Sequence, residues 1–388
     1  MFLLLKIRNF FIRLFAFLVA LVVVLSNLQY MQSLRYDFPD PKPFSGTALY
    51  SPYRSTQMWQ KCNFHAHANA WGGLTDGKTQ TGKMLLAKYD SMQYDIACIS
   101  DYHSINPEQD LDSPTFIPVY EHGHNLFKAH RLALGSKAVS YYDVSLFHTL
   151  SDRQYIINRV KHNSPYLAVA HPKFGGGHTL DDFTYLTGYD LIEVLNHYRL
   201  SDKYWDKALS TGKAAWIIAN DDNHNIRKAD ETGVKWTMVG TNELSNKAII
   251  DNLVGGNAYG VEGKAGRNDL CLESLTTEGT AMHLRLDGVA KEIKLIGQNG
   301  MVKAIFTQQQ AISYGFAPDD TYIRAEITTR NTKMYLNPVV RYDGKHIPTN
   351  PNRAKPLFFA TWFMRLRCLF ALVLTYWLYK KVVFRFPL

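Results

Sequence analysis

The chain has 388 residues, of which 46% are hydrophobic, and its formal net charge is +9. This length and composition predict two or three domains with a large core. Ten Lys and Arg residues, and no acidic residue, lie in segments 1–13 and 353–388, so the rest of the chain is nearly neutral. That part has no basic run interleaved with aromatic residues, and we therefore expect no nucleic-acid partner.

An apolar segment near the N-terminus is the first expected element. Residues 14–31 are eighteen residues without a charge, and basic residues precede them. This is about the minimum length for crossing a hydrocarbon layer of roughly 30 Å. We predict an uncleaved membrane anchor over residues 1–34. A cleaved secretory signal peptide is the alternative, although no small-residue cleavage site follows Val24.

An α/β region follows a predicted tether at residues 35–59, which is rich in Pro, Tyr and Ser. Between residues 60 and 256, short apolar runs alternate with helical stretches, which is typical of a parallel α/β unit. We expect the fold class α/β, with a distorted (β/α)7 barrel. The helices are expected at 85–92, 152–162, 203–209 and 244–253. The expected strands end at Phe64, Ile99, Tyr120, Leu134, Ala170, Leu195 and Ala219.

Side chains of the types that bind metals follow these apolar runs. A parallel barrel gathers the C-terminal ends of its strands at one mouth, where the chemistry takes place. His, Asp and Glu repeated at that position therefore predict a multinuclear metal site. The residues are His65, His67, Asp101, His103, Glu121, His130, His171, Asp222 and His224.

The C-terminal part changes in character. Short alternating stretches predict a small antiparallel β-sandwich over residues 257–350. A second membrane segment is expected at 357–384, where Arg365 and Arg367 interrupt the apolar run. An Arg at the centre of a membrane helix raises the free energy of membrane insertion by roughly 2.5–3.5 kcal/mol. Two alternatives stay open, a span that begins near Cys368 and an interfacial helix.

Charge and cysteine patterns bear on the compartment. Basic residues flank the outer ends of both apolar segments, so we expect both termini in the cytoplasm and the catalytic domain outside it, on a bacterial inner membrane.

None of the four cysteines forms a C-x-x-C pair. Cys62 and Cys98 lie in apolar runs and are expected as small buried side chains, with a disulfide between them left open.

The order of the motifs, H-x-H, Asp then His, Glu, His, His-Pro and D-x-H, resembles the polymerase and histidinol phosphatase (PHP) family of metal-dependent phosphoesterases. The resemblance covers about residues 60–225. The region that follows resembles the branch with carbaryl-type ester hydrolases, at Asn257-Ala258-Tyr259-Gly260 and Leu336-Asn337-Pro338-Val339-Val340. The resemblance to the PHP family implies two to three divalent ions. Imidazole and carboxylate ligands suit zinc, manganese or iron.

The resemblance also implies a ligand set for three metals, in which a shared carboxylate holds two cations at roughly 3.5–4 Å. The first metal takes His65, His67, Glu121 and Asp222; the second shares Glu121 and adds His130 and His171; the third takes Asp76, His103 and His224.

Two features depart from the family pattern. Tyr102 separates Asp101 from His103, which are adjacent in the family, and the step from His67 to Asp76 is longer than usual. Both departures affect the third metal.

The second metal has competing ligands. His122 and His124 compete with His130, but only His130 opens a hydrophobic strand, at 131–135.

Several further residues have predicted roles around the metals. Asp101, His103 and His224 are expected in catalysis, and Asp101 and Glu193 are of the type that orients a ligand histidine. Glycines 175–177 are expected in a flexible loop at the site. The candidates for binding a substrate anion are Lys173, Arg199 and Arg227.

The function that fits these features is a membrane-anchored, metal-dependent hydrolase that uses a metal-activated water on phosphoesters. The same centre could hydrolyse carboxyl or carbamate esters. A membrane-tethered binding protein that keeps metals for structure is the alternative from another class. The expected partners are the membrane and a phosphorylated or ester substrate, with a lipid-linked one among the candidates.

Overall fold

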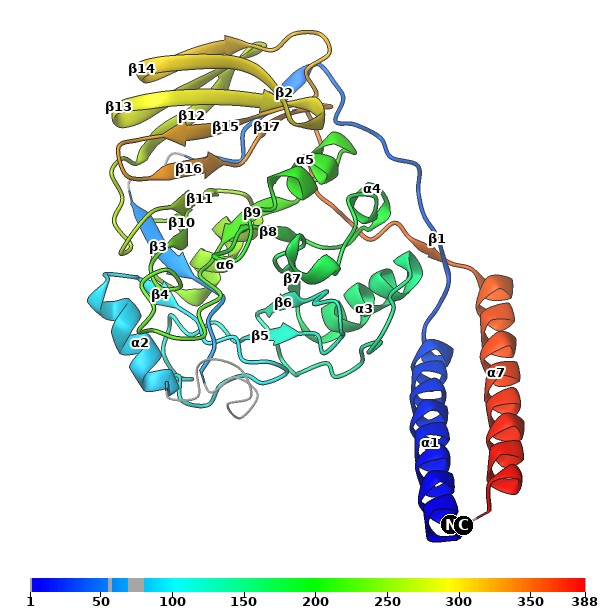
Figure 1. The fold of residues 1–388 in the computed structure, drawn as a ribbon. Helices are drawn as coiled ribbons and strands as arrows, with labels where there is room; N and C mark the ends of the chain where they lie inside the picture. The colour runs from blue at the N-terminus through cyan, green and yellow to red at the C-terminus, as the bar shows by residue number, and fades with distance from the viewer. Residues whose placement is uncertain (1, 55–57, 69–79, 388) are drawn as a thin grey trace.

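Two long helices stand apart from a globular body in the computed structural model, which describes residues 2–54, 58–68 and 80–387 (Figure 1). They are α1 (Phe2–Gln32) and α7 (Phe358–Arg385). Both are long and apolar enough to cross a membrane, by length and composition. They run side by side in opposite directions, so that the two chain ends lie together at the far end of the pair. Both helices fall in the two segments expected to be membrane segments.

A five-stranded sheet forms one part of the globular body, in the order β5-β6-β7-β8-β9. Nearly every residue of these strands is buried, which explains their continuous apolar sequence. β7, β8 and β9 are parallel, as expected, and helices connect them. The strands are β5 (Val119–His122), β6 (Arg131–Leu134), β7 (Tyr166–Val169), β8 (Leu191–Leu195) and β9 (Trp216–Ala219).

The direction of β6 corrects the prediction of an all-parallel unit. β6 pairs antiparallel with both β5 and β7. The cause is the short connection from β5 to β6, residues 123–130. A parallel crossover needs a dozen or more residues, whereas an antiparallel pair needs only a hairpin.

An eleven-stranded sheet forms the other part, and β10 joins its two halves. β3 and β4 lie on one side of β10, and β11, β16, β15, β13 and β12 follow on the other, with β14 paired to β13. The sheet therefore continues across residue 256, where the barrel was expected to end. Nine of its strands are β3 (Trp59–Asn63), β4 (Ile96–Ala97), β10 (Lys235–Gly240), β11 (Ala258–Glu262), β12 (Leu272–Glu278), β13 (Ala281–Gly297), β14 (Met301–Gly315), β15 (Tyr322–Thr328) and β16 (Lys333–Leu336), and the other two pair at its edge, at residues 48–50 and 339–342.

Two isolated parallel bridges connect the sheets. Tyr102, beyond β4, pairs with Glu121 of β5, and Ala66, beyond β3, pairs with Asn223, beyond β9. Backbone hydrogen bonds at 2.8 Å reinforce the second bridge, from Asp222 N to His65 O and from His67 N to Asn223 O. The strand ends that carry the expected ligands are therefore in direct backbone contact.

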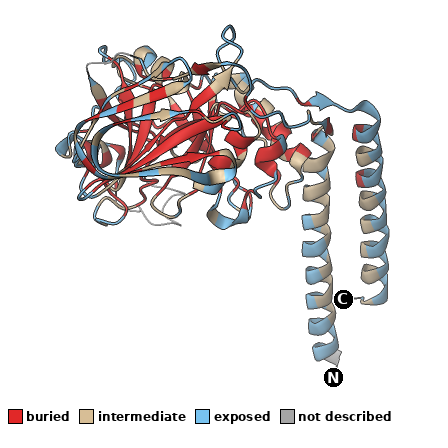
Figure 2. Cartoon of the chain, turned by 90° about the horizontal axis from the view of Figure 1, so that it is seen from above, coloured by how far each residue is buried: buried red, intermediate tan, exposed pale blue. Residues whose placement is uncertain are grey.

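The helices of the globular body begin at polar caps. Thr149 caps the helix over 150–163 in a reciprocal capping box with Asp152. Figure 2 shows the buried residues concentrated in the sheets and in the helix faces against them. All four cysteines are free thiols, so Cys62 and Cys98 form no disulfide. The helices are α2 (Gly82–Ser91), α3 (Leu150–Asn163), α4 (Asp182–Tyr185), α5 (Asp202–Ser210) and α6 (Asn246–Val254), with 3-10 turns η2 (Phe174–Gly176) and η3 (Gln298–Gly300).

The segment expected as a tether is held by strand pairing. Its first strand pairs with a strand just before α7, and its second pairs with a strand of the C-terminal region. The buried Ser33 directly after α1 donates a hydrogen bond to Asp152. The pairs are β1 (Tyr36–Asp37) with β18 (Lys355–Pro356), and β2 (Ala48–Tyr50) with β17 (Val339–Tyr342).

Candidate metal centre

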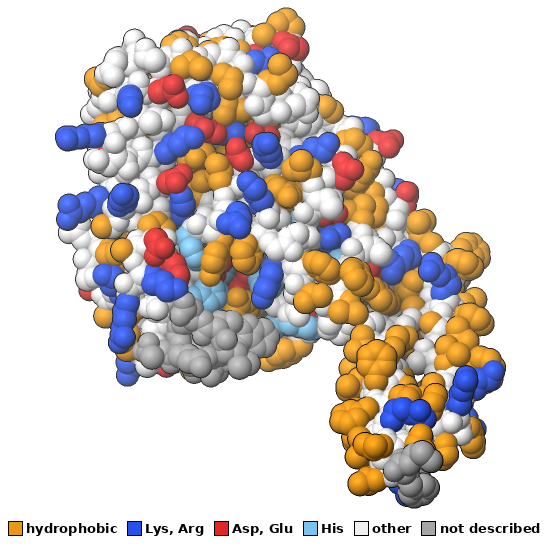
Figure 3. All heavy atoms as spheres, viewed as in Figure 1, with side chains coloured by type: hydrophobic (Ala, Val, Ile, Leu, Met, Phe, Trp, Pro, Cys, Tyr) orange, Lys and Arg blue, Asp and Glu red, His pale blue; other side chains and the backbone are white. Residues whose placement is uncertain are grey.

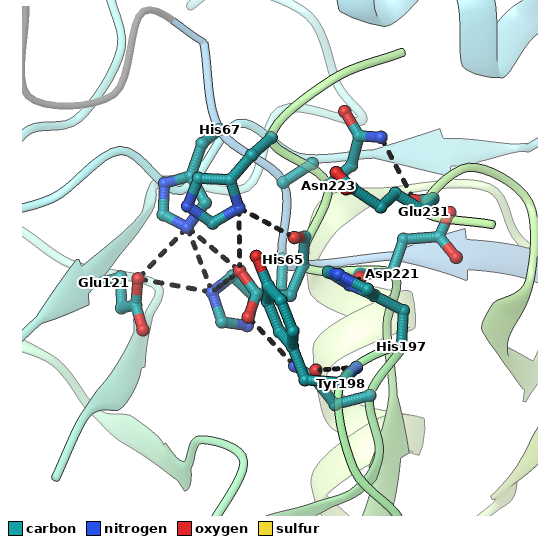
Figure 4. Close-up of polar contacts among 12 residues, drawn as sticks. His65, His67, Glu121, His197, Tyr198, Asp221, Asn223 and Glu231 are labelled. Atoms are coloured by element: carbon teal, nitrogen blue, oxygen red, sulfur yellow. Dashed lines mark hydrogen bonds and ion pairs between the residues drawn. The ribbon is translucent and has the colours of Figure 1, made fainter. Parts of the chain in front are cut away.

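Four buried side chains from three strand ends face one another at the junction of the sheets. His65 and His67 follow β3, Glu121 lies in β5, and Asp222 follows β9. Glu121 Oε2 lies 3.4 Å from His65 Nε2 and 3.1 Å from His67 Nε2. Asp222 Oδ1 lies 3.2 and 3.3 Å from the same two nitrogens. His65, His67 and Glu121 are turned toward one common space (Figure 4), which is the first candidate metal position.

A second group uses the other oxygen of the same carboxylate. Glu121 Oε1 lies 2.6 Å from His130 Nδ1 and 3.0 Å from His171 Nε2. All three side chains are buried. Glu121 therefore has one pair of histidines on each oxygen. Such a carboxylate can bridge two cations.

Unpaired atoms show that this donor set fits a cation. Although histidine nitrogens face Glu121 Oε2 and Asp222 Oδ1, neither oxygen has a hydrogen-bond partner of normal geometry in the part of the chain that the structure describes. Burying a charged oxygen without a partner is costly. A divalent ion held by these two oxygens and the two Nε2 atoms would satisfy all of them. The set is nitrogen and oxygen only, which suits a metal of borderline or hard character.

The backbone at two of these residues is in an uncommon conformation. His171 has φ +27° and Asp222 has φ +51°, in the left-handed region that non-glycine residues rarely adopt. Such strain persists only where surrounding structure fixes it, and it concentrates at functional sites. Here the hydrogen bonds of the bridge between β3 and β9 hold Asp222.

Glu193 of β8 orients the first ligand. Its Oε1 lies 2.9 Å from His65 Nδ1, so Nε2 of that ring points at the centre. Its Oε2 accepts from the backbone N–H of His171 at 2.9 Å. The amide of Asn220 donates to Oε1. Glu193 thus fixes a ligand on each side of the centre, which is how a carboxylate tunes a metal-binding histidine.

The electrostatics of the cluster favour bound positive charge. Burial lowers the pKa of His67, but Asp222 and Glu121 outweigh burial and raise that pKa to about 9. Burial raises the pKa of Glu121, but His130 and His65 hold it well below its usual range. The cluster therefore holds ionised carboxylates, and the pKa values of His65, His67 and His171 are raised so that these rings hold protons more tightly, whereas burial lowers the pKa of His130. A divalent cation would replace those protons, since metal binding needs neutral imidazole.

A solved structure similar to this chain is that of a two-domain protein from Bacteroides vulgatus that contains a predicted PHP-like metal-dependent phosphoesterase. The identity is 13% and the TM-score 0.38, over 83% of this chain and 100% of that one. No protein-family model matches the chain. No curated protein matches it either. The assignment of the site therefore depends on its own geometry.

The competing histidines beside His130 have other partners. The ring of His122 donates from Nε2 to the carbonyl of Tyr142, and burial lowers its pKa to about 3. His124 is exposed. His130 is the histidine of this region that the structure brings to Glu121.

The third predicted metal position differs from the other two. Asp76 lies outside the described residues. His103 donates from Nδ1 to the carbonyl of Ser140 at 3.0 Å and accepts at Nε2 from Gly123 N–H at 3.0 Å, so backbone groups engage both its nitrogens. His224 lies at the edge of the cluster, with its ring centroid 4.4 Å from that of His67. Of the two described members of this trio, the structure thus brings His224 and not His103 to the centre.

The remaining predicted residues lie around the centre. Asp101 accepts from the backbone N–H of Ala68 at 2.7 Å and from Asn106, so it fixes the chain just after His67. Gly175 and Gly177 pack closely on residues 127–129, whereas Gly176 faces open space. Lys173, Arg199 and Arg227 are exposed.

Two residues of the centre escaped prediction. Asn196 directly follows β8 and donates to Asp222 Oδ2 at 3.1 Å and to Glu193 at 3.0 Å. Its place at a strand end was the pattern that could have revealed it. Tyr102 stacks on His67 with ring centroids 4.5 Å apart, and its hydroxyl lies 3.4 Å from His224 Nε2. It was noted only as an interruption between Asp101 and His103.

Proposed function

We propose that the chain is a metal-dependent hydrolase of phosphoesters with two divalent ions at this centre. One observation supports it above all: the two oxygens of Glu121 face two separate pairs of buried histidines. Paired cations that share a bridging carboxylate are typical of enzymes that hydrolyse phosphoesters by in-line displacement. A purely structural metal site has no need of a second adjacent position.

Each residue of the centre has its own role in the proposed reaction. Glu121 would contact both ions, Asp222 would complete the first position, and Glu193 orients His65. When bound, the ions would activate water and neutralise charge on the phosphoryl group. The Tyr102 hydroxyl and His224 lie at the edge, where a leaving oxygen can receive a hydrogen bond. Burial lowers the pKa of His224 to about 4, so this ring is neutral at pH 7.

The finer architecture belongs to the same proposal. We infer a distorted barrel of seven strands, β3 to β9, joined at the two isolated bridges, and a PHP-type enzyme built on it. We also infer that α1 and α7 anchor it in a membrane with both ends in the cytoplasm, since basic residues flank those ends. A reporter active only outside the cytoplasm, fused after residue 350 in place of α7, should be active. An inactive one would place the enzyme on the inner face.

Metal analysis and a phosphatase assay test the central proposal. The full chain, purified in detergent without chelator, should hold two ions and hydrolyse p-nitrophenyl phosphate. His65→Ala and Asp222→Ala should lose both properties. One ion or fewer per wild-type chain would contradict the two-metal site. Hydrolysis of a carboxyl ester but no phosphoester would favour the alternative chemistry.

A further inference from the structure

Exposed hydrophobic side chains border the globular body beside the helix pair. Leu126 and Phe147 lie on neighbouring loops and are 65% and 64% exposed. Phe358, Phe359 and Phe363 at the start of α7 are at least as exposed. Figure 3 shows hydrophobic side chains running from the body onto the helix pair on this face. These five residues are called the rim surface below.

Hydrogen bonds place the rim surface at the inner end of the helix pair. Tyr30, in the last turn of α1, donates its hydroxyl to Phe147 O at 2.7 Å. The backbone N–H of Leu126 donates to the carbonyl of Ser145, whose side chain pairs with Gln29. The loops that carry Leu126 and Phe147 are therefore fixed to α1 where it enters the body.

The start of α7 is fixed at the same level. Arg365 donates from Nε to Met31 O at 3.1 Å. The backbone N–H of Arg35 donates to Thr361 Oγ1 at 2.9 Å. The start of α7, with its phenylalanines, thus lies at the level where α1 ends and the body begins.

The body is held rigidly at this level. Ser33 and Arg35 both contact the buried carboxylate of Asp152, at 2.7 and 3.1 Å. α1 has 31 residues, and at 1.5 Å per residue it covers about 45 Å, which is the thickness of a bilayer with its headgroups. A membrane crossed by α1 therefore ends where the body begins, with the rim surface in its headgroup layer.

The metal centre adjoins the rim surface through one short loop. Residues 123–129 connect β5, which carries Glu121, to His130. Leu126 and the exposed Lys128 lie in the middle of this loop, and its two ends hold two ligands. Figure 3 shows histidine side chains on the same face as the hydrophobic side chains that lead to the helices. Only a few residues of chain thus separate the rim surface from two ligands of the centre.

We propose that the rim surface lies in the bilayer and that the substrate is the phosphoester headgroup of a membrane lipid. The substrate part rests on the proposed function. The hydrophobic side chains continue the apolar helix pair, so the membrane is the partner that covers both. Lys128 supplies positive charge beside the site, which suits an anionic headgroup. The reaction is hydrolysis: water attacks phosphorus, the P–O bond to the lipid breaks, and the leaving oxygen takes a proton.

The position of the rim surface can be tested without activity. The full chain carries a photoreactive benzoylphenylalanine at Leu126 or Phe147 and is reconstituted in phosphatidylcholine nanodiscs. The control position is Val289, which is 57% exposed on β13 at the other end of the molecule (Figure 1). After irradiation, mass spectrometry should find lipid attached at the first two positions and none at Val289. No lipid at 126 and 147, or equal amounts at all three, would overturn the docking.

The substrate is tested with two phosphomonoesters that share a headgroup, one long-chain in the nanodisc and one short-chain in solution. The wild-type chain should hydrolyse the bilayer ester. L126S combined with F147S should lower its kcat/KM about tenfold, mainly through KM, because two apolar side chains leave the interface. The metal content should stay the same, and V289S should change neither quantity.

The outcomes separate the two proposals. Hydrolysis of the soluble ester but not of the bilayer ester overturns the lipid substrate and leaves the phosphoesterase intact. Hydrolysis of neither ester by the metal-loaded chain overturns the proposed function, and the lipid substrate with it. The attachment of lipid at Leu126 and Phe147 still decides where the rim surface lies.

Discussion

Two clusters of buried charged side chains in this molecule differ in how completely their carboxylate oxygens are hydrogen-bonded. In the first, at the metal centre, Glu121 Oε2 and Asp222 Oδ1 have no hydrogen-bond partner of normal geometry among the described residues. The second lies between α5 and β15, where Arg324 donates to Asp206 at 2.7 and 2.8 Å and to Glu326 at 2.8 Å. Lys333 completes it at Glu326 Oε2. Every carboxylate oxygen of the second cluster has a partner.

The contrast separates a binding site from a structural one. Burial alone does not distinguish them, since Arg324, Glu121 and His65 are all almost fully buried. The second cluster is neutralised by its own residues and links the α/β region to the C-terminal strands. The first is complete only when protons or cations occupy it. Changes in the first should therefore affect ligand binding, and changes in the second should affect stability.

The largest expected effect is on activity, in Glu121→Gln. The amide keeps the size of the side chain but cannot bridge two cations, and cations are worth several kcal/mol to the transition state, so kcat should fall on the order of a thousandfold. Elemental analysis should find fewer than two ions. Full activity with two ions would show that this carboxylate is not the bridge.

Arg324→Met should have the largest effect on stability. It leaves Asp206 and Glu326 buried without their main partner, and breaking a buried pair in this way costs about 3–5 kcal/mol. Denaturant unfolding of the full chain in detergent measures it. The folded variant should still bind two ions. Loss of metal with unchanged stability would reverse the roles of the two clusters.

A smaller effect on metal affinity is expected for Glu193→Gln. This side chain orients His65 from its Nδ1 side, and loss of such a partner typically weakens metal affinity about 10–100-fold. Competition with a chelator measures the affinity. The matched control is Glu326→Gln, a buried carboxylate of the other cluster, which should leave it unchanged. Equal weakening in both variants would argue for a general effect on the fold.

The smallest effect is a pH dependence of the metal-free protein. The pKa of His67 is raised from 6.5 to about 9 in the folded chain. Its stabilising contribution is therefore complete below about pH 6.5 and is lost as the pH rises toward about 9. Chelator-treated protein should unfold more easily at pH 9 than at pH 6.5. In His67→Gln this difference should shrink, and an unchanged difference would exclude His67 as its cause.

The strand ends were the most predictable part of the fold and of the site. A buried strand needs a continuous apolar run, so a His or Asp that closes the run stands out in the sequence. His65, Glu121, His171 and Asp222 were found in this way, and the structure brings them together. The mixed α/β class and the two apolar terminal helices follow from the same kind of pattern.

Strand direction and sheet continuity could not be predicted in this way. An apolar run reads the same in either direction, so the antiparallel β6 was not visible. The alternating residues 282–286 and 293–296 of the C-terminal part belong to the single strand β13, although Gly288 lies between them. Hydrogen bonds to backbone groups cannot be inferred from residue types. His103 was therefore expected as a metal ligand, although backbone groups bind both nitrogens of its ring.

The pairing of β1 with β18 has a consequence for biosynthesis. It joins Tyr36 to Pro356, near opposite ends of the chain, and the packing of α1 against α7 does the same. A ribosome delivers the first partner of each pair long before the second. We therefore expect α1 to remain without its partner helix while the rest of the chain is synthesised, and the packing of α1 against α7 to be the last step of assembly.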